Sequence, residues 1–200
     1  RQARPPGATG RTPARPPVCC HGGLYVGGLE EGGVYARRPG RTGTEADSVL
    51  FTTLPMNAQA LHLDAAWSAG QPFGQRLVNS MFTLSTLVGQ SVSQLTQGTI
   101  IAQLGLTDVS FAHPLYHGDT LYTETVITGK RLSGSRPGQG IVSMQHTGRN
   151  QDGTVVAQAT RSCLMWTRDA HTAQSSGQQV QPAGTEKGSV PGPEKRTMSV

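Results

Sequence analysis

The sequence predicts an α+β domain in which an antiparallel sheet packs around one central helix. A long segment, 73–94, carries apolar residues at helical spacing, and four later segments between 99 and 168 are rich in β-branched residues that alternate with polar ones. Both ends of the chain, in contrast, are polar. A helix that is buried on most of its surface and is followed by a run of strands is typical of this fold class.

The domain is expected to span residues 22–168, between disordered tails at 1–21 and 169–200. The first twenty residues are rich in Arg, Pro and Gly and hold no acidic residue, and the last thirty are mostly Gln, Ser, Gly, Pro and Lys. Hydrophobic residues make up 35% of the chain, beside 26 Gly and 13 Pro, and the deficit is concentrated at the two ends. Segments this polar cannot bury enough apolar surface to offset chain entropy.

The charge pattern argues against nucleic-acid binding. The net charge of +5 owes much to four arginines of the first tail, and aromatic residues are only 5% of the chain. A basic face interleaved with aromatic residues is therefore not predicted. The chain has no run of 18 apolar residues, so no membrane span is predicted, and the N-terminus lacks the pattern of a secretory signal.

The three cysteines form no recognisable framework. Cys19 and Cys20 are adjacent, and Cys163 lies in an apolar run typical of a buried residue. Cys and His do not recur at the spacing of a metal site. We therefore expect no metal, and a reduced, cytoplasmic protein.

The first predicted helix begins after Thr44, a good N-cap residue. Glu45 and Asp47 suit the positive end of the helix dipole, and Pro55 ends the helix. A second, short helix is expected at 64–69.

The central helix is expected to run from Gly74 to Gln94. Its apolar stripe recurs at intervals of three and four and is wide enough to be buried on most of the helix; it comprises Leu77, Val78, Met81, Phe82, Leu84, Leu87 and Val88. Turn residues separate the strands that follow, which are expected at 99–111, 119–132, 140–150 and 154–168.

The segment between the first two helices, "MNAQALHLD" at 56–64, presents an amide and an imidazole five residues apart. Imidazole suits proton transfer because its unperturbed pKa of about 6.5 lies near working pH. An amide cannot accept a proton, so Asn57 can orient a water but cannot act as a general base.

This segment and two others resemble the MaoC-like family of hotdog-fold acyl-CoA hydratases and dehydratases. The family's loop reads Asp-x-Asn-Pro-x-His, and Asn57 stands here at the Asp, Gln59 at the Asn and His62 at the His. "PFGQRLVNSM" at 72–81 is similar to the family's motif at the start of the hotdog helix, and "FAHPLYHGDTL" at 111–121 to a later motif. The resemblance covers about residues 24 to 168.

The resemblance implies a single hotdog domain that adds water reversibly to an enoyl-CoA thioester. It implies proton transfer by His62, a water held by Asn57, and a thioester carbonyl polarised by the backbone N–H of Ser80 at the helix start. By the same likeness Gln59, Asn79 and Met81 contact the substrate. CoA is part of the substrate, so no separate cofactor is expected. The exposed sheet edge predicts a homodimer.

Asn57 leaves two readings open. In one, the protein only binds acyl thioesters through a degenerate loop. In the other, His62 carries the proton transfers and Asn57 positions the water, as in the branch of the family that resembles mesaconyl-CoA and itaconyl-CoA hydratases. Substrates of that branch carry a second carboxylate, and an amide at 57 removes its repulsion by an aspartate. A hotdog thioesterase is a weaker third reading, because it also needs an activated water.

The remaining polar residues are interpreted more simply. Glu45, Asp47 and Asp64 are expected to act as helix caps and structural ligands rather than bases. His113 and His117 are expected to be solvated turn residues, and Arg136 a solvated hairpin residue.

Overall fold

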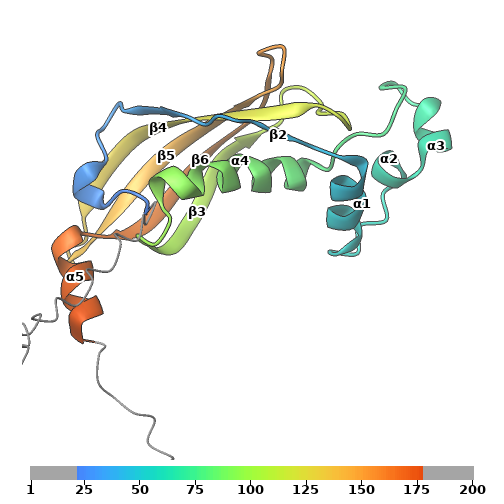
Figure 1. Cartoon of the computed structure of the whole chain (residues 1–200). Helices are drawn as coiled ribbons and strands as arrows, with labels where there is room; N and C mark the ends of the chain where they lie inside the picture. Colours follow the sequence, from blue (N-terminus) through green and yellow to red (C-terminus); the bar gives the residue numbers. More distant parts are fainter. Residues whose placement is uncertain (1–21, 178–200) are drawn as a thin grey trace, which may run out of the picture.

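The computed structural model describes residues 22–177 and has the predicted α+β architecture (Figure 1). Five strands form an antiparallel sheet in the order β1-β4-β5-β6-β3, and a short sixth strand, β2, pairs with β4. The elements in chain order are η1 (Val26–Gly28), β1 (Val34–Ala36), β2 (Arg41–Thr42), α1 (Glu45–Thr53), α2 (Ala60–Leu63), α3 (Ala65–Ala69), α4 (Ser80–Leu95), β3 (Ile100–Ser110), β4 (Thr120–Leu132), β5 (Gln139–Arg149), β6 (Val155–Trp166) and α5 (Arg168–Gly177).

The sheet packs around α4, which lies along one of its faces and contacts β4, β5 and β6 (Figure 1). This is the hotdog arrangement, and the four long strands confirm the predicted segments to within two residues at each end. The short helices α1, α2 and α3 gather at one end of the sheet, and α5 lies at the other.

The central helix begins at Ser80, so the prediction that it begins at Gly74 is wrong. The preceding segment is extended because it pairs with the loop before β4: the Val78 N–H donates to Leu115 O at 2.9 Å, and Leu77 forms a bridge with Tyr116. The helix starts where the Asn79 side chain accepts a hydrogen bond from the Met81 N–H.

The face of α4 that the sheet buries also differs from the predicted stripe. The fully buried positions recur every four residues and include two small polar side chains; they are Thr83, Leu87, Ser91 and Leu95. Met81, expected in the stripe, is 50% exposed. Small residues at alternate turns let the helix lie close to the sheet, and Leu87 reaches the backbone around Gly148, where an added Cβ would meet its side chain at 3.0 Å.

The first helix agrees with its prediction in detail. The Asp47 N–H donates to the Thr44 hydroxyl and the Thr44 N–H donates to the Asp47 carboxylate, which forms a capping box. The predicted short helix is also present, as α3, with Asp64 as its N-cap.

The prediction that residues 169–200 lack structure is wrong for their first part, since α5 continues to Gly177. Its anchor is His171, which stacks on Trp166 with ring centroids 5.9 Å apart and hydrogen-bonds the Tyr25 hydroxyl through Nδ1 at 3.1 Å. Residues 1–21 and 178–200, the rest of both predicted tails, lie outside the described residues. Between 22 and 177 no helix is both long and apolar enough to cross a membrane.

Candidate active site

The loop between α1 and α2 is held by Asn57. Its Oδ1 accepts a hydrogen bond from the Gln59 N–H at 3.0 Å, and its own N–H donates to Thr52 O at 3.1 Å. This turn lets the chain reverse from α1 into α2 after Met56, which has a φ of 59°. Asn57 therefore shapes the loop with its carbonyl oxygen and keeps its amide N–H groups for a solvent molecule or ligand.

His62 lies on α2 and is oriented by a backbone group. Its Nδ1 is 2.9 Å from Leu77 O. A carbonyl oxygen only accepts hydrogen bonds, so Nδ1 carries the proton and the lone pair of the neutral ring lies on Nε2. The ring is half-buried, and its loop is tied to the same segment a second time by the Leu77 N–H, which donates to Leu61 O at 3.1 Å. The geometry thus provides a fixed imidazole with a free acceptor nitrogen.

Ser80 lies at the first position of α4, on the wall of a cavity of about 260 Å³. Its backbone N–H has no acceptor among residues 22–177. The first turn of a helix offers such N–H groups together with the positive end of the dipole, and both stabilise negative charge that develops on a bound carbonyl oxygen. The rest of the wall is mainly apolar and comes from 73–83, 111–115 and Val156.

Leu77 joins these two parts of the site. Its carbonyl holds His62, and the residue also lines the cavity beside Ser80. The His62 imidazole and the Ser80 N–H are therefore both connected to Leu77, at the end of the sheet where α1, α2 and α3 lie (Figure 1).

The other predicted substrate contacts, Gln59, Asn79 and Met81, do not line the cavity. Asn79 is 3% exposed, and both ends of its amide are occupied: Oδ1 accepts from Met81 N–H at 2.9 Å, and Nδ2 donates to the Thr52 hydroxyl at 3.1 Å. Its position is that of a helix cap that ties α4 to α1. Gln59 and Met81 are exposed, and neither they nor Asn57 line the cavity.

Arg76, Glu45 and His117 interact with one another, and His117 also interacts electrostatically with His62. Arg76, one residue before Leu77, is paired with Glu45 at 2.6 Å, and this contact lowers the pKa of the Glu45 carboxyl. His117 is not solvated as expected, because it is half-buried and its Nε2 is buried without a partner. Burial lowers the pKa of His117, Arg76 lowers it further, Glu45 opposes this, and His62 adds a smaller lowering effect.

His113 is exposed, as expected, and it also has a defined position. It lines the cavity, and its Nδ1 donates to Val155 O at 2.9 Å. His113 and His117 both belong to the "FAHPLYHGD" segment, which pairs with Leu77 and Val78. Their place in that motif was the signal that could have identified them.

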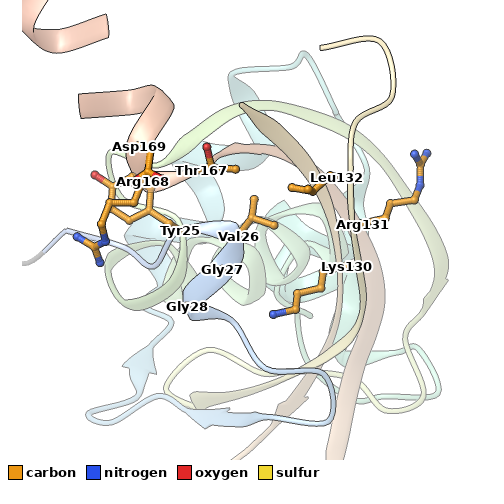
Figure 2. Close-up of a pocket in the computed structure, with 10 residues that line it drawn as sticks. All are labelled: Tyr25, Val26, Gly27, Gly28, Lys130, Arg131, Leu132, Thr167, Arg168 and Asp169. Atoms are coloured by element: carbon orange, nitrogen blue, oxygen red, sulfur yellow. The ribbon is translucent and has the colours of Figure 1, made fainter. Parts of the chain in front are cut away.

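A second cavity, of about 630 Å³, lies at the opposite end of the sheet, where α5 begins (Figure 2). Its wall comes from 25–28, 130–132 and 167–169 and holds no histidine. None of the three motifs at 56–64, 72–81 and 111–121 contributes to this wall. The cavity lined by Ser80 and by Leu77, which holds His62, is therefore the better candidate for chemistry.

Comparison with known proteins identifies the family. The model of the MaoC like domain matches residues 29–150. The chain belongs to the MaoC-like dehydratase family. The matched range holds the loop, the start of α4 and the segment before β4, so it includes every residue of the candidate site except Val155 and Val156.

Several MaoC-like proteins are similar to this chain. It is 32% identical to protein MaoC of Klebsiella aerogenes over 98 residues, 49% of this chain and 29% of that protein. It is 30% identical to the beta-methylmalyl-CoA dehydratase of Chloroflexus aurantiacus over 136 residues, 64% of this chain and 36% of that protein. The chain thus spans about a third of the length of these two relatives.

A solved MaoC-like dehydratase from Rhodospirillum rubrum has a similar structure. It superposes with a TM-score of 0.65 at 26% identity, and the match covers 73% of this chain and 99% of that one. The likeness therefore extends over nearly the whole of a single-domain MaoC-like protein.

Proposed function

We propose that this MaoC-like domain catalyses the reversible addition of water to the double bond of a 2-enoyl-CoA thioester. The observation that carries the proposal is the hydrogen bond from His62 Nδ1 to Leu77 O, which leaves Nε2 as an acceptor and ties the imidazole to a residue that lines the cavity together with Ser80. A fixed imidazole base beside free helix-terminal N–H groups is what hydration of a conjugated thioester requires.

In the proposed reaction, the Asn57 amide N–H groups hold a water, and His62 Nε2 takes a proton from it as its oxygen bonds to C3. The electron pair of the C2–C3 double bond moves to the thioester, whose carbonyl oxygen becomes an enolate oxygen stabilised by the Ser80 N–H. The imidazolium then returns the proton to C2 and the thioester re-forms. The net change is the addition of one water, and no cofactor takes part beyond the CoA of the substrate.

The acyl group is proposed to be short, and branched or dicarboxylic, such as mesaconyl or itaconyl. The cavity of about 260 Å³ is smaller than the roughly 300–1,000 Å³ typical of sites for drug-sized ligands, which favours a short chain. The relative named for beta-methylmalyl-CoA has a branched dicarboxylic substrate, which supports the same class. Asn57 supports it as well, because an amide does not repel a substrate carboxylate.

We also propose that the protein forms a homodimer and that it is reduced and cytoplasmic. Strand β3 lies at the edge of the sheet and exposes Leu104 at 50% and Val109 at 39%, and an apolar edge of this length favours pairing with a second copy. The free, buried thiol of Cys163 is compatible with a reducing compartment. Light scattering at micromolar concentration tests the dimer, and a monomer would refute it.

A second candidate function is binding of acyl thioesters without catalysis. It is favoured by one observation. Asn57 stands where the family has an aspartate, and its side-chain oxygen already accepts a hydrogen bond from the Gln59 N–H. The absorbance of a conjugated enoyl thioester, followed together with free thiol, separates the candidates. Loss of conjugation without free thiol supports hydration, and release of thiol indicates a thioesterase. Binding of the CoA ester with neither change indicates the non-catalytic reading.

A further inference from the structure

Arg76 has more hydrogen-bonding capacity than the structure uses. Its guanidinium carries five N–H groups, and one of them, on Nη2, donates to Glu45 Oε1 at 2.6 Å. The other four have no acceptor among residues 22–177. A guanidinium typically binds a carboxylate through two parallel N–H groups, so Arg76 retains the capacity for a second carboxylate.

Solvent exposure decides which charge dominates around this pair. The Arg76 side chain is 17% exposed and the Glu45 side chain is 60% exposed. Water screens the field of the exposed carboxylate more strongly than that of the half-buried guanidinium. The charge of Arg76 is therefore less screened than that of Glu45, although the formal charges of the two residues cancel.

Arg76 is also close to the reacting groups. It directly precedes Leu77, whose carbonyl fixes His62 and which lines the cavity together with Ser80. His117, which interacts electrostatically with both Arg76 and His62, lies in the same region and offers a buried, unpartnered Nε2. A carboxylate bound near Arg76 would thus lie next to the site of water addition.

A buried guanidinium with unpartnered nitrogens, that of Arg161, is too distant for this task. Arg161 is 4% exposed, with Nε and Nη1 buried and unpartnered. It lies on β6 opposite Met144, and Met144 belongs to the same core cluster as Leu95 near the end of α4. Between Ser80 and Leu95 the helix rises by roughly 22 Å at 1.5 Å per residue, several times the length of a four-carbon acyl group.

We propose that Arg76 binds the second carboxylate of a dicarboxylic enoyl-CoA and so determines the substrate class of the site. The proposal rests on the hydratase function proposed above and adds a specificity residue to it. Glu45 acts as the competing ligand of Arg76 in the free protein, and the substrate carboxylate takes over part of the guanidinium.

The test compares Arg76→Gln and Glu45→Gln, which break the same ion pair from its two sides. The readout is the ratio of kcat/KM on mesaconyl-CoA to kcat/KM on crotonyl-CoA, measured with the full chain. Arg76→Gln is expected to lower this ratio about 10- to 100-fold, the usual effect of losing charge-assisted hydrogen bonds to a carboxylate. Glu45→Gln is expected to keep or raise the ratio, because it removes a competitor.

A purely structural ion pair would give a different result, in which both variants change activity alike on both substrates. That result would overturn the proposal, as would an unchanged ratio in Arg76→Gln. Wild-type protein that hydrates crotonyl-CoA but not mesaconyl-CoA would also overturn it and leave the hydratase function intact. Wild-type protein that hydrates neither, nor any other enoyl-CoA of a panel, would refute the hydratase function itself.

Discussion

Replacing Asn57 by aspartate tests the meaning of the amide in the loop. Aspartate has the same shape, and its carboxylate can accept the Gln59 N–H in the same turn, so the loop is expected to keep its conformation. The change adds a potential base beside His62 and also adds one negative charge. On a dicarboxylic substrate the new base should raise the rate and the new charge should lower it. On an uncharged substrate only the base should affect the rate.

The magnitude of the charge effect follows from the position of Asn57. Two unit charges 4 Å apart repel by about 4 kcal/mol at an effective dielectric of 20 and by about 1 kcal/mol in bulk water. Because Asn57 is exposed, the penalty should lie nearer the lower value, equivalent to roughly fivefold or more in kcat/KM. A new general base can raise turnover by about 10²–10⁴-fold on the uncharged substrate.

Steady-state kinetics on crotonyl-CoA and mesaconyl-CoA measure both effects. We expect Asn57→Asp to shift preference toward crotonyl-CoA, and Asn57→Ser, which keeps an acceptor for the Gln59 N–H without a charge, to leave the preference where it is. A gain of equal size on both substrates would refute the reasoning. Asn57 would then be a weakened catalytic residue and not an adaptation to charge.

Two further predictions concern stability. Asn79→Ala removes the cap of α4 and leaves the buried Thr52 hydroxyl without its donor. The free energy of unfolding in urea should fall by about 2–4 kcal/mol, with partial recovery in Asn79→Ser, which can still cap; a loss below roughly 0.5 kcal/mol would contradict the capping role. His146 is fully buried beside the Thr125 hydroxyl, and burial, followed by the charge of Arg161, lowers its pKa to about 4. The unfolded chain binds this proton near pH 6.5, so the contribution of His146 to stability is complete above that pH and is lost as pH falls toward 4, by about 3 kcal/mol in total. Urea unfolding at a series of pH values should show this loss in the wild type and a flatter profile in His146→Gln; identical profiles would contradict it.

The fold could be predicted from the sequence because its signals are local. Thr44 and Asp47 lie three residues apart and form the expected capping box, and each long strand has its own alternation between turn residues. The start of α4 could not be predicted in this way. Apolar periodicity continues back to Leu77, and what makes that segment extended is its pairing with Leu115 and Tyr116, which lie 37 to 39 residues away along the chain.

The candidate site could be predicted in part for the same reason. His62 stands out by residue type and position, but the hydrogen bond to Leu77 that fixes its tautomer joins residues 15 apart, and no local pattern contains it. His117 was expected to be solvated because it precedes a Gly-Asp turn, whereas the folded chain buries its Nε2 near Arg76. The helix α5 likewise depends on contacts of His171 with Trp166 and Tyr25, not on its own polar composition.

The most direct test of the account is the hydration rate of a conjugated enoyl-CoA by the wild type and by His62→Ala, with binding of a CoA ester measured on both. We predict that the wild type removes the conjugated absorbance without releasing thiol. In His62→Ala the rate should fall by about 10²–10⁴-fold while ester binding persists, because the Ser80 N–H and the cavity remain. A rate in His62→Ala within about threefold of the wild type would contradict the proton-transfer role of His62.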